Sequence, residues 1–400
     1  MSKIIFHIDV NSAFLSWSAL ENLKNGSEVD LRDIPAIIGG DQTRRLGVVL
    51  AKSVPAKKYG IVTGEPVVNA VRKCPNLVLE SPDHHLYDRY SKAMMQLLLS
   101  YTPDIEKVSV DECFLDFTPI AHSHPSPLAF AKTISRRIKD ELGFTVNIGI
   151  APNKLLAKMA SDFQKPDKIH TLFENELATK MWPLPAGELY GVGKASTARL
   201  LSLGINTIGD LASADPAFLI SHFKSHGKYM HNAANGIDDS IVDNSNREVK
   251  GVGNSTTLST DATTIKEAEK VLLMLAESVA KRLRKKQQLA GSVTVEIKYN
   301  TFETTTHQTT LNTATNTTDA IYKCACELFK ESWDGTPIRL LGIRTAKLEA
   351  SGTPVQLSLF DLKDDNHDDE KRQKLDAALD LIRQKHGKNA ITRGSLLENE

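Results

Sequence analysis

Three acidic residues lie where the sequence predicts the ends of two neighbouring strands. Asp9 closes an apolar run, and Asp111 with Glu112 stands between two strand-like runs, 105–110 and 113–117. Adjacent residues of a regular strand point to opposite faces, so Asp111 and Glu112 can serve one site only at the tip of a hairpin. Three carboxylates so placed suit hard cations such as Mg²⁺. Two such ions would assist an in-line phosphoryl transfer, whereas an exposed acidic turn is the simpler interpretation of the pair alone.

The elements that must position these carboxylates alternate between strands and helices. In chain order, apolar periodicity predicts strand 3–10, helix 13–23, a strand pair within 34–51, helix 88–101, strands 105–110 and 113–117, helix 127–142, strand 145–150 and helix 153–163, with Asn153 as its N-cap. This βαββαβα-like order predicts an α+β domain in which helices cover one face of an antiparallel sheet.

The rest of the chain is predicted to form further parts. Short helices broken by Gly and Pro are predicted for 173–239, and a polar linker for 240–256. A second α+β unit, assigned to 257–349, is predicted to contain helix 262–286, strands 291–300 and 306–311, helix 316–333 and strand 337–348. Within the tail, 350–400, the acidic stretch 361–370 predicts a solvated linker, and a final amphipathic helix carries Leu375, Leu379 and Ile382 on one face.

Composition describes a multidomain globular chain. Its 400 residues correspond to about two to four domains. The 49 Lys and Arg residues balance 49 Asp and Glu residues, so any nucleic-acid surface must be a local basic patch. Four cysteines without zinc-site spacing indicate a reducing compartment. Because the sequence shows neither a signal-peptide pattern nor an apolar run of membrane-spanning length, we expect a cytoplasmic protein without a membrane partner.

Three stretches, in order and in spacing, resemble the Y-family (DinB/UmuC-like) of translesion DNA polymerases. They are Phe6-His-Ile-Asp-Val-Asn-Ser-Ala-Phe14, Ser109-Val-Asp-Glu112 and the longer stretch 149–166, and the resemblance extends over about residues 3–348. It implies a right-hand α+β multidomain architecture with a palm at 1–172, small fingers inserted at about 24–80, a helical thumb at 173–239 and a little finger at 257–349. It implies template-directed, low-fidelity transfer of nucleotides from dNTPs to a primer 3′-hydroxyl in DNA damage tolerance.

The resemblance also implies how the carboxylates would be used. Asp9 and Asp111 would bind two Mg²⁺ ions, for which Mn²⁺ can substitute. Glu112 would bind the ion at the attacking 3′-hydroxyl, and the main-chain carbonyl of Val10 would add a ligand. All four residues lie within the first two motifs of the family.

Further residues match the family's nucleotide-binding positions. Phe14 matches the bulky side chain that packs where a ribose 2′-hydroxyl would sit, and Lys165 matches a lysine that reaches the triphosphate. A core aromatic and a solvated lysine are the alternatives from the residues alone. The fingers segment departs from many relatives, because Val54 and Lys57 stand where a tyrosine and an arginine would clasp the triphosphate. Lysine neutralises phosphate as a point charge without the fork of arginine, and Lys52 is a candidate to compensate.

Two segments are predicted to grip DNA. The run 189–211 fits a helix–hairpin–helix, whose Gly191-Val-Gly193 turn would offer free amides to a phosphate while Lys194 adds charge. A plain αα-hairpin is the alternative. A basic run ends the long helix of the second α+β unit, and we expect it to contact duplex phosphates, although many such runs are solvated helix ends. Its residues are Lys281, Arg282, Arg284, Lys285 and Lys286.

A pentapeptide past the last predicted strand resembles the motif by which bacterial polymerases bind the sliding clamp. It lies between a Gly- and Pro-containing turn and the acidic linker, and a final strand folded back on its own domain is the alternative. Its clamp-binding candidates are Gln356, Leu357, Leu359 and Phe360. The expected partners are therefore primer–template DNA, dNTP and the sliding clamp, and the chain is expected to act as a monomer.

Two other functions compete with the polymerase. The first is another palm-type nucleotidyl transferase, such as a cyclase, which would not need the predicted grip on duplex DNA. The second is a catalytically weak DNA-binding adaptor that has kept the polymerase fold, and Val54 with Lys57 is its only support. Primer extension would separate the first from a polymerase, and single-turnover incorporation would separate the second.

Overall fold

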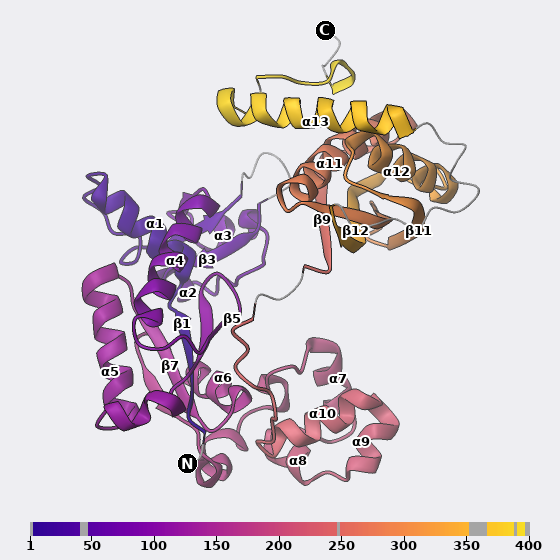
Figure 1. Ribbon diagram of the computed structural model, residues 1–400. Coiled ribbons are helices and arrows are strands. Elements are labelled where there is room, and N and C mark those ends of the chain that lie inside the picture. The colour runs from indigo at the N-terminus through magenta and orange to yellow at the C-terminus, as the bar shows by residue number, and fades with distance from the viewer. Residues whose placement is uncertain (1–2, 41–46, 246–248, 352–365, 388–389, 397–400) are drawn as a thin grey trace. The chain divides into compact units, whose positions relative to one another are not determined.

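The computed structural model describes residues 3–40, 47–245, 249–351, 366–387 and 390–396. They divide into two compact units, the first holding the described residues up to 245 and the second those from 249 onward (Figure 1). No helix of the described residues is both long enough and apolar enough to cross a membrane.

A five-stranded sheet forms the centre of the first unit. Its order is β5-β6-β1-β7-β8, and the strands are β1 (Ile5–Val10), β5 (Ile105–Lys107), β6 (Glu112–Asp116), β7 (Val146–Ala151) and β8 (Ile169–Thr171). Neighbouring strands are antiparallel except β7 and β8, which are parallel. All six residues of β1 are buried, because this central strand is covered on both faces.

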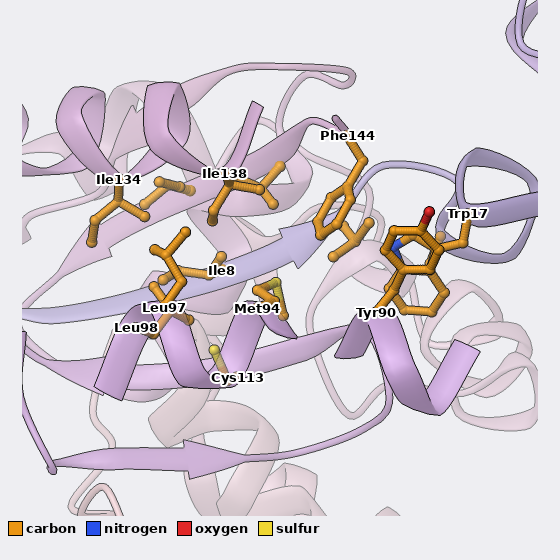
Figure 2. Close-up of a cluster of buried hydrophobic side chains, with 14 of the residues drawn as sticks. Ile8, Trp17, Tyr90, Met94, Leu97, Leu98, Cys113, Ile134, Ile138 and Phe144 are labelled. Carbon is orange, nitrogen blue, oxygen red and sulfur yellow. The ribbon is translucent and has the colours of Figure 1, made fainter. Parts of the chain in front are cut away.

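Helices pack against both faces of this sheet. One face carries α1 (Ala13–Lys24), α4 (His84–Leu99) and α5 (Pro127–Arg137), which a π turn (Ile138–Leu142) extends. Figure 2 shows Ile8 of β1 packed among side chains of α4 and α5, with Trp17, Tyr90 and Phe144 grouped beside them. The opposite face carries α6 (Lys154–Asp162). Asn153 caps α6 as expected, since its side chain accepts from the main-chain nitrogen of Leu156 at 2.9 Å.

The expectation of helices on only one face is therefore wrong. Period-two alternation sends Phe6 and Ile8 of β1 toward α4 and α5, and His7 and Asp9 toward α6. Because α6 follows β7 directly in the sequence, it covers the carboxylate side of the sheet. This second layer brings α6 side chains close to Asp9.

The fingers form a small sheet with its own core. The strand order is β3-β2-β4, with β2 (Ala36–Gly39), β3 (Val49–Lys52) and β4 (Val78–Glu80), and two helices, α2 (Val54–Lys57) and α3 (Val67–Lys73), accompany them. Their apolar side chains form a separate cluster, made of Ile37, Val49, Ala56, Ile61, Val67, Ala70 and Cys74. All these elements fall within the range 24–80 that was expected for the fingers.

Short helices follow the palm, as the Gly and Pro pattern of 173–239 predicts. They are α7 (Lys194–Ser202), α8 (Ile208–Ser213), α9 (Pro216–Phe223) and α10 (Ser225–Ala234). Short 3₁₀ or π helices also occur at Thr118–Ser123, Glu174–Glu176, Leu177–Met181, Ala186–Glu188 and Gly394–Leu396. The core of the thumb helices is continuous with that of α6, since Leu155 and Met159 share a cluster with Leu200 and Met230.

The second unit is a four-stranded antiparallel sheet with helices α11 (Ile265–Lys285) and α12 (Thr318–Ser332). Its order is β11-β10-β12-β9, with β9 (Gly251–Ala262), β10 (Gln288–Tyr299), β11 (Thr304–Thr315) and β12 (Ile338–Ala350). Strand β9 begins inside the stretch 240–256, so the expectation of a linker up to 256 is wrong. The polar sequence of β9 becomes a strand because it pairs with β12, where Gly342 faces Ser255.

A last helix, α13 (Asn366–His386), lies over α11 and α12 in the second unit (Figure 1). Its expected apolar face is largely exposed, because Leu375 is 53% and Ile382 is 39% accessible. Charged side chains contact the domain instead, and Asp376 is buried against Arg284 of α11. Ion pairing rather than apolar burial therefore sets the orientation of α13.

Candidate active site

The three carboxylates lie at one end of the sheet of the first unit. Asp9 of β1 stands opposite Glu112 of β6, and the main-chain nitrogen of Val10 donates to the carbonyl of Asp111 at 3.0 Å. Asp111 belongs to the turn that joins β5 to β6, so the expected hairpin tip is confirmed. Ser109 holds this turn, because its hydroxyl donates to Asp111 Oδ1 at 2.6 Å and accepts from the nitrogen of Glu112 at 3.2 Å.

Two lysines provide the positive charge that faces these carboxylates. Lys165 forms an ion pair with Asp9, and its Nζ lies 2.8 Å from Asp162 Oδ1. Lys158 of α6 places its Nζ 2.8 Å from Glu112 Oε2 and 4.0 Å from Asp9 Oδ2. Helix α6 and the segment that follows it therefore supply the counter-charges of Glu112 and Asp9.

Glu112 is ionised at neutral pH. Hydrogen bonding to His7, together with Lys158, lowers the pKa of Glu112 to about 2. His7 is buried, its Nε2 lies 3.3 Å from Glu112 Oε2, and its Nδ1 lies 2.8 Å from Ser161 Oγ of α6. Burial lowers the pKa of His7. A carboxylate kept charged in this way can bind a cation without first losing a proton.

The predicted nucleotide residues share one open pocket with two of the carboxylates. The pocket has a volume of about 380 Å³, and the fingers contribute residues from β3 and α2 to its wall. The predicted site residues that line it are Asp9, Val10, Phe14, Lys57, Asp111 and Lys165. The ring of Phe14 stacks on Tyr87 of α4, with centroids 4.3 Å apart and planes 9° from parallel. Glu112 is not among the lining residues.

The donor set of this site suits a hard divalent cation. Its candidate ligands are carboxylate and carbonyl oxygens at adjoining strand ends. Among the described residues, no three His, Cys, Asp or Glu side chains converge closely enough to hold an ion. Each of the three carboxylates already has a partner, since Asp9 pairs with Lys165, Glu112 pairs with Lys158 and Asp111 accepts from Ser109. A bound cation would therefore have to replace these lysines as the counter-charge.

The predicted phosphate-binding turn of the thumb lies at the start of α7. Gly191 has φ of +89°, which favours glycine, and an added Cβ would lie 2.7 Å from the hydroxyl of Tyr229. Gly193 is the N-cap of α7, and a Cβ added there would meet nothing within 4 Å. Lys194 is exposed beside it. The turn thus presents an open glycine and a lysine at a helix start.

The side chains of the basic run at the end of α11 differ in exposure and in their partners. Arg282 and Lys285 are exposed, Lys281 is half-buried, and Arg282 Nη1 donates to the carbonyl of Gly253 at 2.7 Å. Arg284 was expected to contact DNA phosphates with the rest of the run, but its side chain is paired within the second unit. Its guanidinium lies 3.0 Å from Asp376 and 2.8 Å from Asp380 and donates to the carbonyl of Asn316, so Nε and Nη1 are engaged by neighbouring residues.

The clamp-binding candidates Gln356, Leu357, Leu359 and Phe360 lie outside the described residues.

Lys158 and Tyr87 are among the contributors to the site that were absent from the predictions made from the sequence. Lys158 was overlooked, although a lysine amid the apolar residues of predicted helix 153–163 needs a carboxylate partner when buried. Tyr87 was overlooked because nothing in the chain indicates that it stacks on Phe14, more than seventy positions earlier. Both contacts depend on pairings between distant segments.

Comparisons with known proteins agree with this arrangement. The chain matches the family model described as the impB/mucB/samB family over residues 8–162, and that family's C-terminal domain over residues 249–359. It is 49% identical to DNA polymerase IV of Clostridium acetobutylicum over 400 residues, covering all of both chains. It is 38% identical to DNA polymerase IV 1 of Bacillus subtilis over 401 residues, covering 100% of this chain and 94% of that protein.

A solved structure shares the fold. The Y-family DNA polymerase chimera Dbh-Dpo4(243-245)-Dbh superposes with a TM-score of 0.76 at 22% identity, covering 87% of this chain and 99% of that one. Polymerases of this family depend on metal ions, in keeping with the oxygen donors described above. The two family-model matches and the full-length relatives show that this chain belongs to the Y-family, the template-directed DNA polymerases of translesion synthesis.

Proposed function

We propose that Asp9, Asp111 and Glu112, with the main-chain carbonyl of Val10, hold two Mg²⁺ ions at which this polymerase joins a dNTP to a primer 3′-hydroxyl. The pocket is the observation that carries the proposal, because Asp9 and Asp111 line it together with the predicted nucleotide residues. Carboxylates for metal and ammonium groups for phosphate thus stand in one space. Mn²⁺, which accepts the same oxygen ligands, is expected to substitute.

The residues of the chain would divide the work as follows. Bound divalent ions would activate the attacking hydroxyl and stabilise charge on the leaving group. Lys165 and Lys57 would neutralise phosphate oxygens from the two sides of the pocket. Phe14, held flat against Tyr87, would fill the volume that a ribose 2′-hydroxyl needs and so select deoxynucleotides.

The DNA partner would be held by groups remote from the metals. The Gly191-Val-Gly193 turn with Lys194 supports a backbone contact, because free amides at a helix start suit a phosphate. Lys281, Arg282 and Lys285 would contact duplex phosphates, and Arg284 is left out of this set because Asp376 and Asp380 occupy it. We further propose that Gln356, Leu357, Leu359 and Phe360 bind a sliding clamp, and that the enzyme acts as a cytoplasmic monomer.

Primer extension with carboxylate variants tests the metal assignment. Asp9→Ala or Asp111→Ala should lower the extension rate to below about a hundredth of wild type, since two-metal chemistry requires both ligands. Affinity for primer–template DNA should stay close to wild type because the proposed grip lies elsewhere. Asp88→Ala on the exposed side of α4, where Asp88 pairs only with Lys92, is the matched acidic control.

Retained extension in either variant would remove the two-metal assignment. Single-turnover incorporation by the wild-type chain, with Mg²⁺ and then Mn²⁺, also decides whether Val54 and Lys57 leave the site catalytically weak. A wild-type chain that bound primer–template without extending it under both metals would contradict the proposal and favour the adaptor.

A further inference from the structure

The fingers wall of the pocket contains a lysine that stands beside the departures from the family pattern. Lys52 is the last residue of β3, and its strand neighbour Ala51 belongs to the buried core of the palm sheet. Lys52 lines the pocket together with Val54 and Lys57. Val54 is 50% exposed and brings no polar group to this wall. The fingers wall therefore presents two ammonium groups, those of Lys52 and Lys57, beside the apolar Val54.

Lys52 has no acidic partner in the part of the chain that the structure describes. Its Nζ contacts only the hydroxyl of Thr63, at 3.5 Å, and Thr63 also lines the pocket. Glu65 is the acid whose charge acts on Lys52. Its carboxylate is paired with Lys73 instead, with an Nζ–Oε2 distance of 2.7 Å. Partial burial, and then the charges of Lys57 and Lys73, lower the pKa of Lys52. A cation deprived of water and of a carboxylate gains most from an anionic ligand.

The chemistry of the pocket indicates which anion that is. Lys52 and Lys57 line the fingers side, while Asp9, Asp111 and Lys165 line the palm side. A nucleoside triphosphate is a chain of anions long enough to meet cations on both walls, whereas a single carboxylate would reach one. Ammonium groups recognise phosphate as point charges and do not require a fixed planar geometry. Two lysines can therefore replace the fork of one arginine.

We propose that Lys52 binds phosphate oxygens of the incoming dNTP, sharing with Lys57 the triphosphate contact that Val54 cannot make. The inference rests on the proposed function of the pocket as the nucleotide site. It makes Lys52 a substrate-binding residue of the fingers in addition to the predicted Lys57 and Lys165.

Single-turnover incorporation of a dNTP opposite an undamaged template tests this role. Lys52→Ala should raise the apparent Kd for dNTP about tenfold, the usual effect of losing a charge-assisted hydrogen bond, with a smaller fall in the maximal rate. Lys52→Arg should restore most of the affinity, because guanidinium also binds phosphate. Lys58→Ala is the matched control, since Lys58 is an exposed lysine at the end of α2 that does not line the pocket.

Three measurements made beside the kinetics keep the outcomes distinct. The thermal unfolding midpoint shows whether Lys52→Ala still folds, and primer–template affinity shows whether the loss concerns DNA. The double variant Lys52→Ala with Lys57→Ala should bind dNTP more weakly than either single variant. A Kd for Lys52→Ala no higher than that of Lys58→Ala would overturn the proposal, as would a loss of DNA affinity alone. An inactive Asp9→Ala beside an unaffected Lys52→Ala would reject this inference while leaving the proposed function in place.

Discussion

Lysines neutralise the proposed metal ligands in the structure described here. Lys165 pairs with Asp9, and Lys158 pairs with Glu112. A divalent ion that bound these carboxylates would take the place of the ammonium groups as their counter-charge. Lys165 also lines the pocket, so the nitrogen displaced from Asp9 would lie beside the incoming phosphates.

Phe14 should control the choice between deoxyribonucleotides and ribonucleotides. Its ring lines the pocket and is backed by Tyr87, so truncation would enlarge the pocket at this wall. We expect Phe14→Ala to raise the ratio of ribonucleotide to deoxyribonucleotide incorporation by about tenfold or more, within the range that one pocket contact supplies. Steady-state incorporation of paired rNTP and dNTP substrates measures this ratio.

Phe14→Tyr is the matched control, because the ring and its stacking are kept and discrimination should survive. An unchanged preference in Phe14→Ala, together with a lowered unfolding midpoint, would assign Phe14 to the core.

At the level of secondary structure, the basic residues at the end of α11 have two different roles: some are proposed to bind DNA, and one holds α13. Residues four apart on a helix share one face, and Lys281 with Lys285 follows that spacing. Arg284 turns instead to Asp376 and Asp380 of α13. One basic run therefore provides both a surface cluster and an internal ion pair.

Replacing Lys281, Arg282 and Lys285 together with alanine should weaken duplex binding for all sequences alike. Each phosphate contact that is lost lowers the slope of log affinity against log salt by about 0.9 for B-form DNA. Binding isotherms at several salt concentrations measure that slope. Lys266→Ala, an exposed lysine at the other end of α11, serves as the control and should leave it unchanged. A slope equal to wild type in the triple variant would make the run a solvated helix end.

Asp376 should support the little finger through α13. Its side chain is buried, lies 3.0 Å from Arg284 Nη1 and 3.3 Å from Arg393 Nη2, and accepts from the main-chain nitrogen of Thr318 at 2.7 Å. Removing one partner of a buried ion pair leaves the other charges uncompensated, so Asp376→Ala should destabilise the domain by about 3 kcal/mol. Urea unfolding measures the change.

Gln373→Ala, at an exposed position of the same helix, is the control for Asp376→Ala. A loss below about 1 kcal/mol, the usual worth of an exposed pair, would show that α13 contributes little to the domain.

Across the whole chain, nucleotide chemistry and DNA contact are distributed unequally between the two units. The residues that line the pocket all belong to the first unit, whereas proposed DNA contacts occur in both, at Lys194 and at Lys281. Variants of the second unit should therefore change DNA affinity before they change the chemical step.

The proposed clamp motif is tested at this same level. Replacing Gln356, Leu359 and Phe360 with alanine should abolish clamp binding and processive synthesis on clamp-loaded DNA, because a tether raises the effective concentration of polymerase at the primer end. Extension without clamp should hardly change. Processivity assays with and without loaded clamp give both values. Equal losses in the two assays would place the segment in the fold and reject the tethering proposal.

Local features of the sequence were sufficient to predict the frame of the site. The alternation in β1, the turn at Asp111 and the Asn153 cap each depend on residues a few positions apart, and the structure confirms all three. The resemblance to the Y-family, rather than any local pattern, brought Phe14, Lys57 and Lys165 into one prediction, and all three line the pocket. Short-range patterns succeed here because backbone geometry couples near neighbours directly.

Contacts between distant segments could be read only from the folded chain. Helix α6 covers the face of the sheet that was expected to be bare, and it brings Lys158 to Glu112, 46 residues away. Arg284, grouped by sequence with its solvated neighbours, pairs with Asp376 at a separation of 92 residues. Apolar periodicity identifies the apolar face of α13, but it does not show which face of the helix packs against the rest of the domain. Charge and periodicity can be read from one segment of the sequence. Which distant segment a side chain contacts depends on how the two segments pack in the folded protein.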